Sequence, residues 1–220
     1  MSKYGRKKSS SSNQLKSQMN SDLKCITIVH GKSEYLISSY IKSAYRVCMK
    51  IYSAGKEGSQ SIQITSLLHF LDTHEKLRNF IDFKRNFNDV LSFSKKNGVE
   101  VIDDFKIFII MDTDDCEQHQ SVSFMNKEMF RGKWYYEYIV PIYNSRNLEE
   151  VLEKGRFPHK VDKKRKGVTY TEIFPGSDPV GTKEQKIEEF IRACEKSRSS
   201  NYKAYLDYCL ENRPNFTKNC

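Results

Sequence analysis

The feature that most constrains this chain is the segment from Phe105 to Met111 (FKIFIIM), which carries apolar residues on both of its faces. A strand with one solvated face alternates apolar and polar residues, whereas an apolar run is typical of a central strand in a parallel sheet covered on both sides. Three carboxylates, Asp112, Asp114 and Asp115, follow this run. The segment therefore predicts an α/β fold with an acidic turn after its most buried strand.

A second strand-to-helix turn lies near the start of the chain. Residues 23–29 (LKCITIV) form a short run rich in β-branched residues, which predicts a buried strand. Gly31 then permits a tight turn or the close approach of a ligand, and Ser33 is a candidate N-cap. Apolar residues at helical spacing predict a helix from Glu34 to about Tyr52. The first amides of such a helix favour an anion.

The remaining elements complete an α/β pattern. We expect a second strand over 61–64, two helices within 66–95 that end before Gly98, a polar loop over 116–133, an edge strand within 135–143, a short helix from 148, a loop with a short strand over 155–182, and a helix over 184–210. This order predicts a compact, mostly parallel sheet flanked by helices. We divide the chain into a disordered basic tail (1–21), an α/β domain (22–145) and a helix-rich C-terminal extension packed on it (146–220).

Charge and hydropathy restrict the partners. The net charge is +9 over 220 residues, which favours contact with a polyanion such as nucleic acid. Much of the excess lies in two runs, Lys3–Lys8 and Lys160–Lys166, and solvated runs are an equally good reading of them. No apolar segment approaches the ~20 residues needed to span a bilayer, and the N-terminal residues are polar. We therefore expect a cytoplasmic protein without a membrane partner.

The two turns together indicate a metal site. Ligands of open α/β sheets bind beyond the carboxyl ends of the strands. If the two strands are neighbours, His30 and Glu34 lie close to Asp112 and Asp114. Hard oxygen ligands suit Mg²⁺ or Mn²⁺, and such an ion can polarise a phosphoryl group and activate a water molecule. The alternative is an Asp-rich turn that only caps the next segment.

Other sites receive less support. The six cysteines are scattered, and Cys116-x-x-His119 has no second pair to complete a zinc site. Gly31-Lys32-Ser33 lacks the first glycine of a P-loop, because Ile26 stands at that position. No Gly-x-Ser-x-Gly turn is present, so a serine-hydrolase triad has no support.

With its Gly31 turn, Glu34, and a later strand ending in Asp112-x-Asp114, the chain resembles TOPRIM-domain proteins. It is most similar to the small RloB-like and overcoming-lysogenization-defect nucleases of bacterial defence loci. The resemblance covers roughly residues 23–145. It implies a compact parallel sheet, an acidic cluster that binds Mg²⁺, and cleavage or rejoining of phosphodiesters. By this resemblance Asp112, Asp114 and Glu34 are the metal ligands.

The chain departs from the family pattern at His30, where the family usually has a glutamate before the glycine. Several readings remain open. His30 replaces the first metal ligand or acts as a general acid. Alternatively, Glu34 takes the role of the missing glutamate, or the site is degenerate. Lys32 is a candidate contact for a phosphate, with a solvated lysine as the alternative.

A further acidic residue is common near the last strand of such relatives. Glu149 and Glu150 are the candidates here, and we favour the simpler reading that they are acidic residues in the first turn of a helix, where they are stabilising.

The candidate metal site together with this resemblance implies a divalent-metal-dependent phosphodiesterase of nuclease type in bacterial or phage defence. His30, Glu34 and Lys32 are its candidate catalytic residues. The alternatives are a degenerate module that binds nucleic acid or a nucleotide, and a protein-interaction subunit with a protein partner or a second copy of itself. The Trp134-Tyr135-Tyr136 stretch could stack bases, but packing on an edge strand is the favoured reading.

Overall fold

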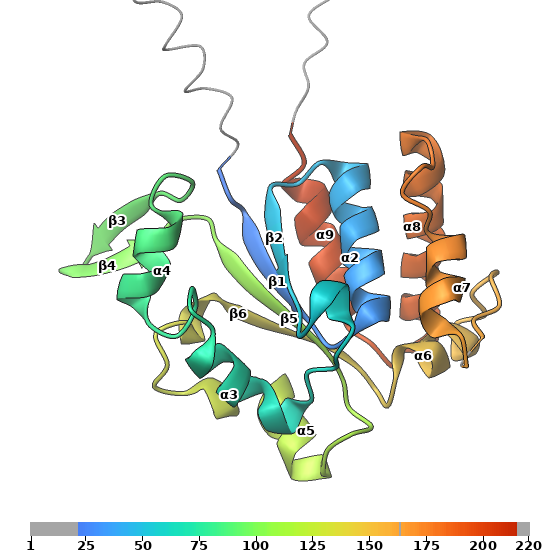
Figure 1. The fold of residues 1–220 in the computed structure, drawn as a ribbon, viewed down its shortest axis with the longest axis horizontal. Coiled ribbons are helices and arrows are strands. Elements are labelled where there is room, and N and C mark those ends of the chain that lie inside the picture. Colours follow the sequence, from blue (N-terminus) through green and yellow to red (C-terminus); the bar gives the residue numbers. More distant parts are fainter. Residues whose placement is uncertain (1–21, 163, 215–220) are drawn as a thin grey trace, which may run out of the picture.

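A four-stranded, all-parallel sheet forms the centre of the molecule (Figure 1). The computed structural model describes residues 22–162 and 164–214, so the tail predicted over residues 1–21 lies outside the described part. The strands stand in the order β2 (Met49–Tyr52), β1 (Cys25–Val29), β5 (Lys106–Asp112) and β6 (Ile139–Asn144). Helices cover the sheet, and the predicted α/β class is confirmed.

The order in which successive strands are added to the sheet reverses between β1 and β5. From β1 the chain moves outwards to β2, then returns past β1 to β5 and continues outwards on the opposite side to β6. Strands β1 and β5 pair in parallel along their whole length, from Cys25 with Lys106 to Val29 with Ile110. A crevice forms outside the carboxyl ends of two strands at such a switch point, and it is the usual ligand site of open α/β sheets.

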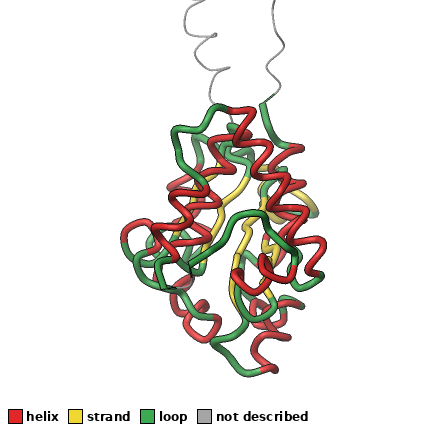
Figure 2. The backbone as a smooth tube through the Cα atoms, turned by 90° about the vertical axis from the view of Figure 1, so that its right-hand side faces the viewer, coloured by secondary structure: helices red, strands yellow, loops and turns green. Residues whose placement is uncertain are grey.

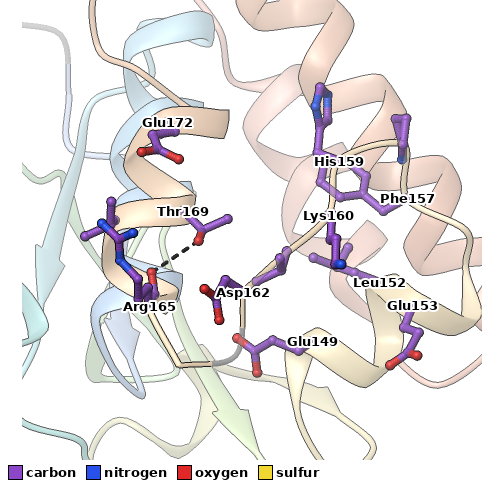
Figure 3. A pocket seen from close by; sticks show the side chains of 13 residues that line it. Glu149, Leu152, Glu153, Phe157, His159, Lys160, Asp162, Arg165, Thr169 and Glu172 are labelled. Carbon is purple, nitrogen blue, oxygen red and sulfur yellow. Dashed lines mark hydrogen bonds between the residues drawn. The ribbon is translucent and has the colours of Figure 1, made fainter.

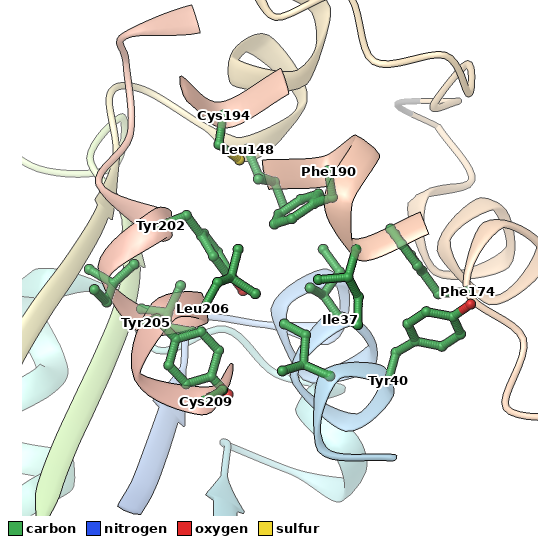
Figure 4. Close-up of a cluster of buried hydrophobic side chains, with 14 of the residues drawn as sticks. Ile37, Tyr40, Leu148, Phe174, Phe190, Cys194, Tyr202, Tyr205, Leu206 and Cys209 are labelled. Atoms are coloured by element: carbon green, nitrogen blue, oxygen red, sulfur yellow. The ribbon is translucent and has the colours of Figure 1, made fainter. Parts of the chain in front are cut away.

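One face of the sheet carries the first helix and the C-terminal helices. These are α2 (Lys32–Tyr45), α6 (Leu148–Lys154), α7 (Lys166–Ile173), α8 (Val180–Ser197) and α9 (Tyr202–Glu211). Their buried side chains form one core with the sheet, and aromatic residues are prominent in it (Figure 4). Tyr205 of α9, for example, packs edge-on against Phe108 of β5 at 5.0 Å between ring centroids. The C-terminal helices are therefore part of the sheet's own core.

The other face carries most of the elements between β2 and β6 outside the sheet, whereas the first of them, η1, packs on the N-terminus of α2. They are the 3₁₀ turn η1 (Lys56–Gly58), helices α3 (Ile64–Thr73), α4 (Phe80–Phe87) and α5 (Gln118–Met125), the antiparallel hairpin of β3 (Phe93–Lys96) and β4 (Val99–Ile102), and the short turns η2 (Glu128–Phe130) and η3 (Tyr136–Tyr138). A second apolar core lies beneath them. Figure 2 views the molecule from the side of α7 and α8, with the strands lying behind helices.

Alternation along the central strand decides which face receives its terminal acid. Phe108 and Ile110 belong to the core under α2, whereas Ile109 and Met111 belong to the opposite core. Because successive side chains of a strand point to opposite faces, Asp112 continues the row of Phe108 and Ile110. Its carboxylate therefore belongs to the face that carries α2 and α6.

The second strand of the chain lies earlier in the sequence than predicted. Helix α2 ends at Tyr45, and Arg46 adopts a left-handed conformation with φ of 55°. The second strand is Met49–Tyr52, which we had included in the helix, while 61–64 lies outside the strands. The apolar residues of 47–52 happened to continue the helical spacing, so periodicity alone did not separate the two elements.

Four further predictions of local structure were wrong in extent or in type. The second helical pattern ends at Phe87, and a hairpin follows whose turn residues Asn97 and Gly98 both have positive φ, at 54° and 79°. Two predicted loops contain helices α5 and α7, and no strand is found within the described part of 155–182. The long C-terminal helix is divided into α8 and α9 at Arg198, which has φ of 54°.

No helix in the described ranges is both long enough and apolar enough to cross a membrane.

Gly155, which ends α6, fixes the close approach of α6 to α8. A Cβ atom at this position would overlap the backbone carbonyl of Ala193. We expect Gly155→Ala to lower the free energy of unfolding by about 1–3 kcal/mol, because two backbones would have to separate. Urea denaturation followed by circular dichroism measures the change.

Gly181→Ala is the matched control, since Gly181 lies in α8 with open space around it. It should leave stability unchanged or raise it by up to about 1 kcal/mol, because alanine is the better helix former. Equal stability of the two variants would contradict the proposed role of Gly155.

Candidate functional site

The turn after β1 lies beside the end of β5, as the switch point requires. The backbone amide of His30 donates to the carbonyl of Ile110 at 2.9 Å, which extends the pairing of the two strands by one residue. Asp112 follows two residues after Ile110. The sequence motifs around Gly31 and Asp112, which are some eighty positions apart in the chain, therefore meet at one edge of the sheet.

Glu34 lies in the first turn of α2 and is almost fully buried, with 2% of its surface exposed. Its Oε2 accepts a hydrogen bond from the amide of Gly31 at 3.1 Å. Gly58 packs so closely on Gly31 that a Cβ at Gly58 would lie 2.8 Å from the Gly31 carbonyl carbon. The N-terminus of α2 is thus capped by its own glutamate and covered by η1, which leaves little room for the anion expected there.

Asp112 is 5% exposed, and a side chain of the neighbouring strand β6 fixes its carboxylate. Its Oδ1 accepts a hydrogen bond at 3.0 Å from the side-chain amide of Asn144, its register partner on β6. Asn144 is completely buried, and its own Oδ1 has no hydrogen-bond partner among the described residues. An unpaired buried acceptor is costly, so this oxygen is one mark of an incomplete polar cluster.

Glu149 brings a third buried carboxylate to this edge of the sheet. It lies in the first turn of α6 and is 4% exposed. Its Oε2 accepts a hydrogen bond from Lys166 Nζ at 2.7 Å, and its Oε1 accepts one from the hydroxyl of Tyr170 at 3.4 Å. Both partners come from α7, so α7 supplies the positive charge nearest to Glu149.

Burial and mutual repulsion mark Glu34, Asp112 and Glu149 as one electrostatic unit, hereafter the acid cluster. Burial raises the pKa of Asp112 well above its ordinary value, and the charges of Glu34 and Glu149 add to the shift against the opposing hydrogen bond from Asn144. Burial also raises the pKa of Glu34, with His30 opposing and Glu149 adding to the shift.

The partners on α7 respond to the same field. Burial raises the pKa of the Tyr170 phenol, and the charges of Glu149, Glu34 and Asp112 raise it further. For Lys166, burial opposes ionisation, but the hydrogen bond to Glu149 and the charges of the acid cluster raise its pKa. Carboxylates packed in this way repel one another unless a cation neutralises them.

His30 stands beside the acid cluster and faces Asp115. Its Nδ1 lies 2.8 Å from the carbonyl oxygen of Ile62 and 4.0 Å from a carboxylate oxygen of Asp115. Because a carbonyl only accepts, Nδ1 carries the hydrogen, and Nε2 is the nitrogen left for other contacts. Both carboxylate oxygens of Asp115 are buried without a hydrogen-bond partner among the described residues. Burial raises the pKa of Asp115, and the charge of His30 opposes this shift.

Asp114 lies at the rim of the site and ties it to α6. Its Oδ2 accepts a hydrogen bond at 2.9 Å from the side chain of Asn147, the N-cap of α6. The amides of Thr113 and Asp114 both donate to the carbonyl of Arg146. The carboxyl ends of β5 and β6 are therefore joined by a network that fixes where α6 begins and where Glu149 lies.

Lys32 forms an ion pair with Glu57 and not with the acid cluster. Its Nζ lies 2.9 Å from Glu57 Oε2 of η1, with the Lys32 side chain half-buried and that of Glu57 exposed. The structure therefore brings His30, Glu34 and Asp112 together, with Asp114 at the rim, and pairs Lys32 with Glu57.

Within residues 22–162 and 164–214, no three His, Cys, Asp or Glu side chains stand in an arrangement that could hold a metal ion directly. The hydrogen bonds of Lys166 and Tyr170 hold Glu149, and Asn144 holds Asp112. Binding of a cation by these carboxylates would require their side chains to move.

Sequence reasoning missed several of these residues. It favoured an ordinary role for Glu149, and it gave no role to Asn144 or Tyr170. Lys166 was considered only within the basic run Lys160–Lys166, for which phosphate contact and solvation were equally good readings. The one available signal was the end of the strand itself, because Asn144 and Glu149 follow β6 as Asp112 follows β5.

Neither a scan against protein-family models nor searches of curated proteins and of solved structures gave a match for this chain.

The raised pKa values predict how stability depends on pH. A carboxyl group whose pKa is higher in the folded state binds more protons there, so its contribution to stability is lost as pH rises through the raised value. We therefore expect Asp112→Asn to be more stable than the wild type at pH 8, by about 1 kcal/mol for each pKa unit removed. The difference should shrink as pH falls towards the ordinary aspartate value of 3.8.

Urea denaturation in EDTA at several pH values tests this expectation. Asp89→Asn serves as the control, because Asp89 is exposed on the loop after α4. An Asp112→Asn variant that is less stable than the wild type at pH 8 would contradict the assigned repulsion.

Proposed function

We propose that this protein is a divalent-metal-dependent phosphodiesterase of nuclease type. The observation that carries the proposal is the convergence of three buried carboxylates, Glu34, Asp112 and Glu149, at the switch point of the sheet. A fold alone needs no such group, since isolated buried charges destabilise it. Groups with shifted pKa values in this position are typical of functional sites.

The donor set of the acid cluster agrees with Mg²⁺ or Mn²⁺. All three side chains offer hard oxygen ligands, and the buried Oδ1 of Asn144 is an acceptor still without a partner. Such an ion, when bound, supplies a Lewis acid and lowers the pKa of a bound water. Asp112, Glu34 and Glu149 would hold it, and the charge of Asp114 at the rim also acts on Asp112.

The surrounding residues have separate roles in this proposal. Lys166 neutralises Glu149 in the free protein and is the cation best placed to contact a scissile phosphate. His30, whose Nδ1 is held by Ile62, presents Nε2 as the proton donor to a leaving oxygen. Asn144 positions Asp112 through its amide. A net charge of +9 supports a polyanionic substrate, and nucleic acid is the class we propose.

Metal binding provides the first test. Titration of the wild type with Mn²⁺ and Mg²⁺ by calorimetry should show binding, and the Glu34→Gln/Asp112→Asn variant should lose it, because the amides keep the shape but remove the charge. Asp72→Asn/Asp89→Asn, two acids remote from the cluster, should bind as the wild type does. The absence of binding to the wild type at millimolar metal would refute the proposal.

Lys166 provides the second test. We expect Lys166→Ala to lower kcat for cleavage of a single-stranded oligonucleotide by roughly 10²–10³-fold, the usual effect of removing one preorganised charge from a transition state. Lys164→Ala removes an exposed lysine two residues away and should leave kcat nearly unchanged. A Lys166→Ala variant with unaltered kcat would exclude this residue from the chemistry.

A second candidate function is nucleic-acid binding without chemistry. It is favoured by the absence of a ready three-ligand arrangement among the described residues and by the lysine that already neutralises Glu149. In this case, binding of oligonucleotides should survive chelation and weaken steeply with salt, and no cleavage should follow the addition of Mn²⁺.

A further inference from the structure

A cavity of about 980 Å³ lies next to the acid cluster, between α6, α7 and the segment 157–162. Glu149 lines it, so the carboxylate held by Lys166 and Tyr170 also forms part of the cavity wall (Figure 3). The volume is in the range of pockets that enclose a small organic ligand. Neither the acid cluster nor the fold explains why this space is left open.

The inner surface of the cavity includes a firmly held aromatic ring. Phe157 stacks on Phe174 at 6.2 Å with an interplanar angle of 20° and contacts Phe190 edge-on. Leu152, Val161 and Val168 extend the apolar surface around it. Nucleobases stack on aromatic side chains of this kind. Such stacking accepts any base, because every base has a π face.

The polar lining carries two basic side chains, Lys160 and Arg165, and four carboxylates, Glu149, Glu153, Asp162 and Glu172. Figure 3 shows Arg165, Thr169 and Glu172 on the wall formed by α7, opposite Lys160 and Phe157. Within the described part of the chain, the side chains of Lys160, Arg165 and Glu172 have no hydrogen bond or ion pair. Two unpaired cations can hold a phosphate, and a carboxylate can accept hydrogen bonds from the amino group of a base.

We propose that this cavity binds one nucleotide of a single-stranded substrate, beside the phosphodiester that lies at the acid cluster. The base packs against Phe157 and Val168, Lys160 and Arg165 contact its phosphate, and Glu172 favours bases that carry an amino group. A base must be unpaired to enter such a pocket, so the substrate is single-stranded at this position. This inference rests on the proposed function for its connection to cleavage, but the binding itself needs no metal.

Val168→Trp tests the proposal by filling the cavity from an exposed position on α7, where 45% of the valine surface is accessible. Val180→Trp is the matched control, because Val180 of α8 is 42% exposed and lies outside the cavity lining. Affinity is measured on the full chain by fluorescence anisotropy with fluorescein-labelled twelve-nucleotide dA, dC and dT strands in EDTA.

The wild type should bind the dA and dC strands more tightly than the dT strand, and Glu172→Gln should reduce this preference. Val168→Trp should weaken binding of the dA strand about tenfold, as expected for the loss of one stacked base, while Val180→Trp should stay within about twofold of the wild type. Equal affinities of the two tryptophan variants, or no binding by the wild type, would overturn the proposal.

A second pair of variants addresses the phosphate contact without filling the cavity. Lys160→Ala/Arg165→Ala should reduce the salt dependence of binding by roughly 1.4 in the slope of log K against log salt, since each lost contact to single-stranded phosphate accounts for about 0.7. Arg192→Ala/Lys196→Ala, which removes the same charge from α8, should leave the slope unchanged. Equal slopes for the two double variants would contradict the phosphate contact.

The two proposals fail in different ways. Calorimetry with Mn²⁺ reports on metal binding at the acid cluster, and the comparison of Val168→Trp with Val180→Trp in EDTA reports on the cavity without metal. Nucleotide binding that depends on Val168 in a protein that binds no metal would support the cavity and refute the nuclease. Metal-dependent cleavage with binding insensitive to Val168→Trp would support the nuclease and refute the cavity as a nucleotide site.

Discussion

The parallel pairing of β1 with β5 is the constraint on which the site depends. It places the turn at His30 and Gly31 beside Asp112, and it does so through backbone hydrogen bonds that depend little on side-chain identity. The neighbouring pairing of β5 with β6 adds Asn144 at the same level. The crevice at this edge follows from the topology, because the chain leaves β1 in one direction and β5 in the other.

The acid cluster places like charges in a position that burial makes unfavourable. Glu34, Asp112 and Glu149 are each at most 5% exposed, and the pKa values of the first two are raised by burial and by their neighbours. Helix α7 supplies the compensation, with a charged hydrogen bond from Lys166 and a phenol from Tyr170. Proteins commonly retain such local conflicts where function requires them, and this is the physical basis of our functional proposal.

Helix α7 connects this cluster with the cavity beside it. One of its faces presents Lys166 and Tyr170 to Glu149, while Arg165, Val168, Thr169 and Glu172 line the open space. Helix α6 is held against α8 at Gly155 and against the end of β5 through Asn147. The C-terminal helices therefore both complete the core under the sheet and build one wall of the proposed substrate site. A single nucleotide strand could in this way contact the acid cluster and the cavity together.

Local sequence determined the central strand, the acidic turn after it, and the first strand with its glycine turn. It predicted a helix after that turn but misplaced its start, since the N-cap is Gly31 and α2 begins at Lys32, whereas Ser33 had been the candidate N-cap. In each case the signal lies within a few neighbouring residues: an apolar run, a glycine, or carboxylates directly after a strand. It did not separate α2 from β2, because the residues of 47–52 continue the helical period, and it gave no warning of the hairpin or of α7. Only the tertiary structure decided that Glu149 and Lys166 join Glu34 and Asp112. Their meeting depends on contacts between segments that lie 37 to 132 positions apart, which no local pattern encodes, and on burial, which strengthens the interactions between their charges.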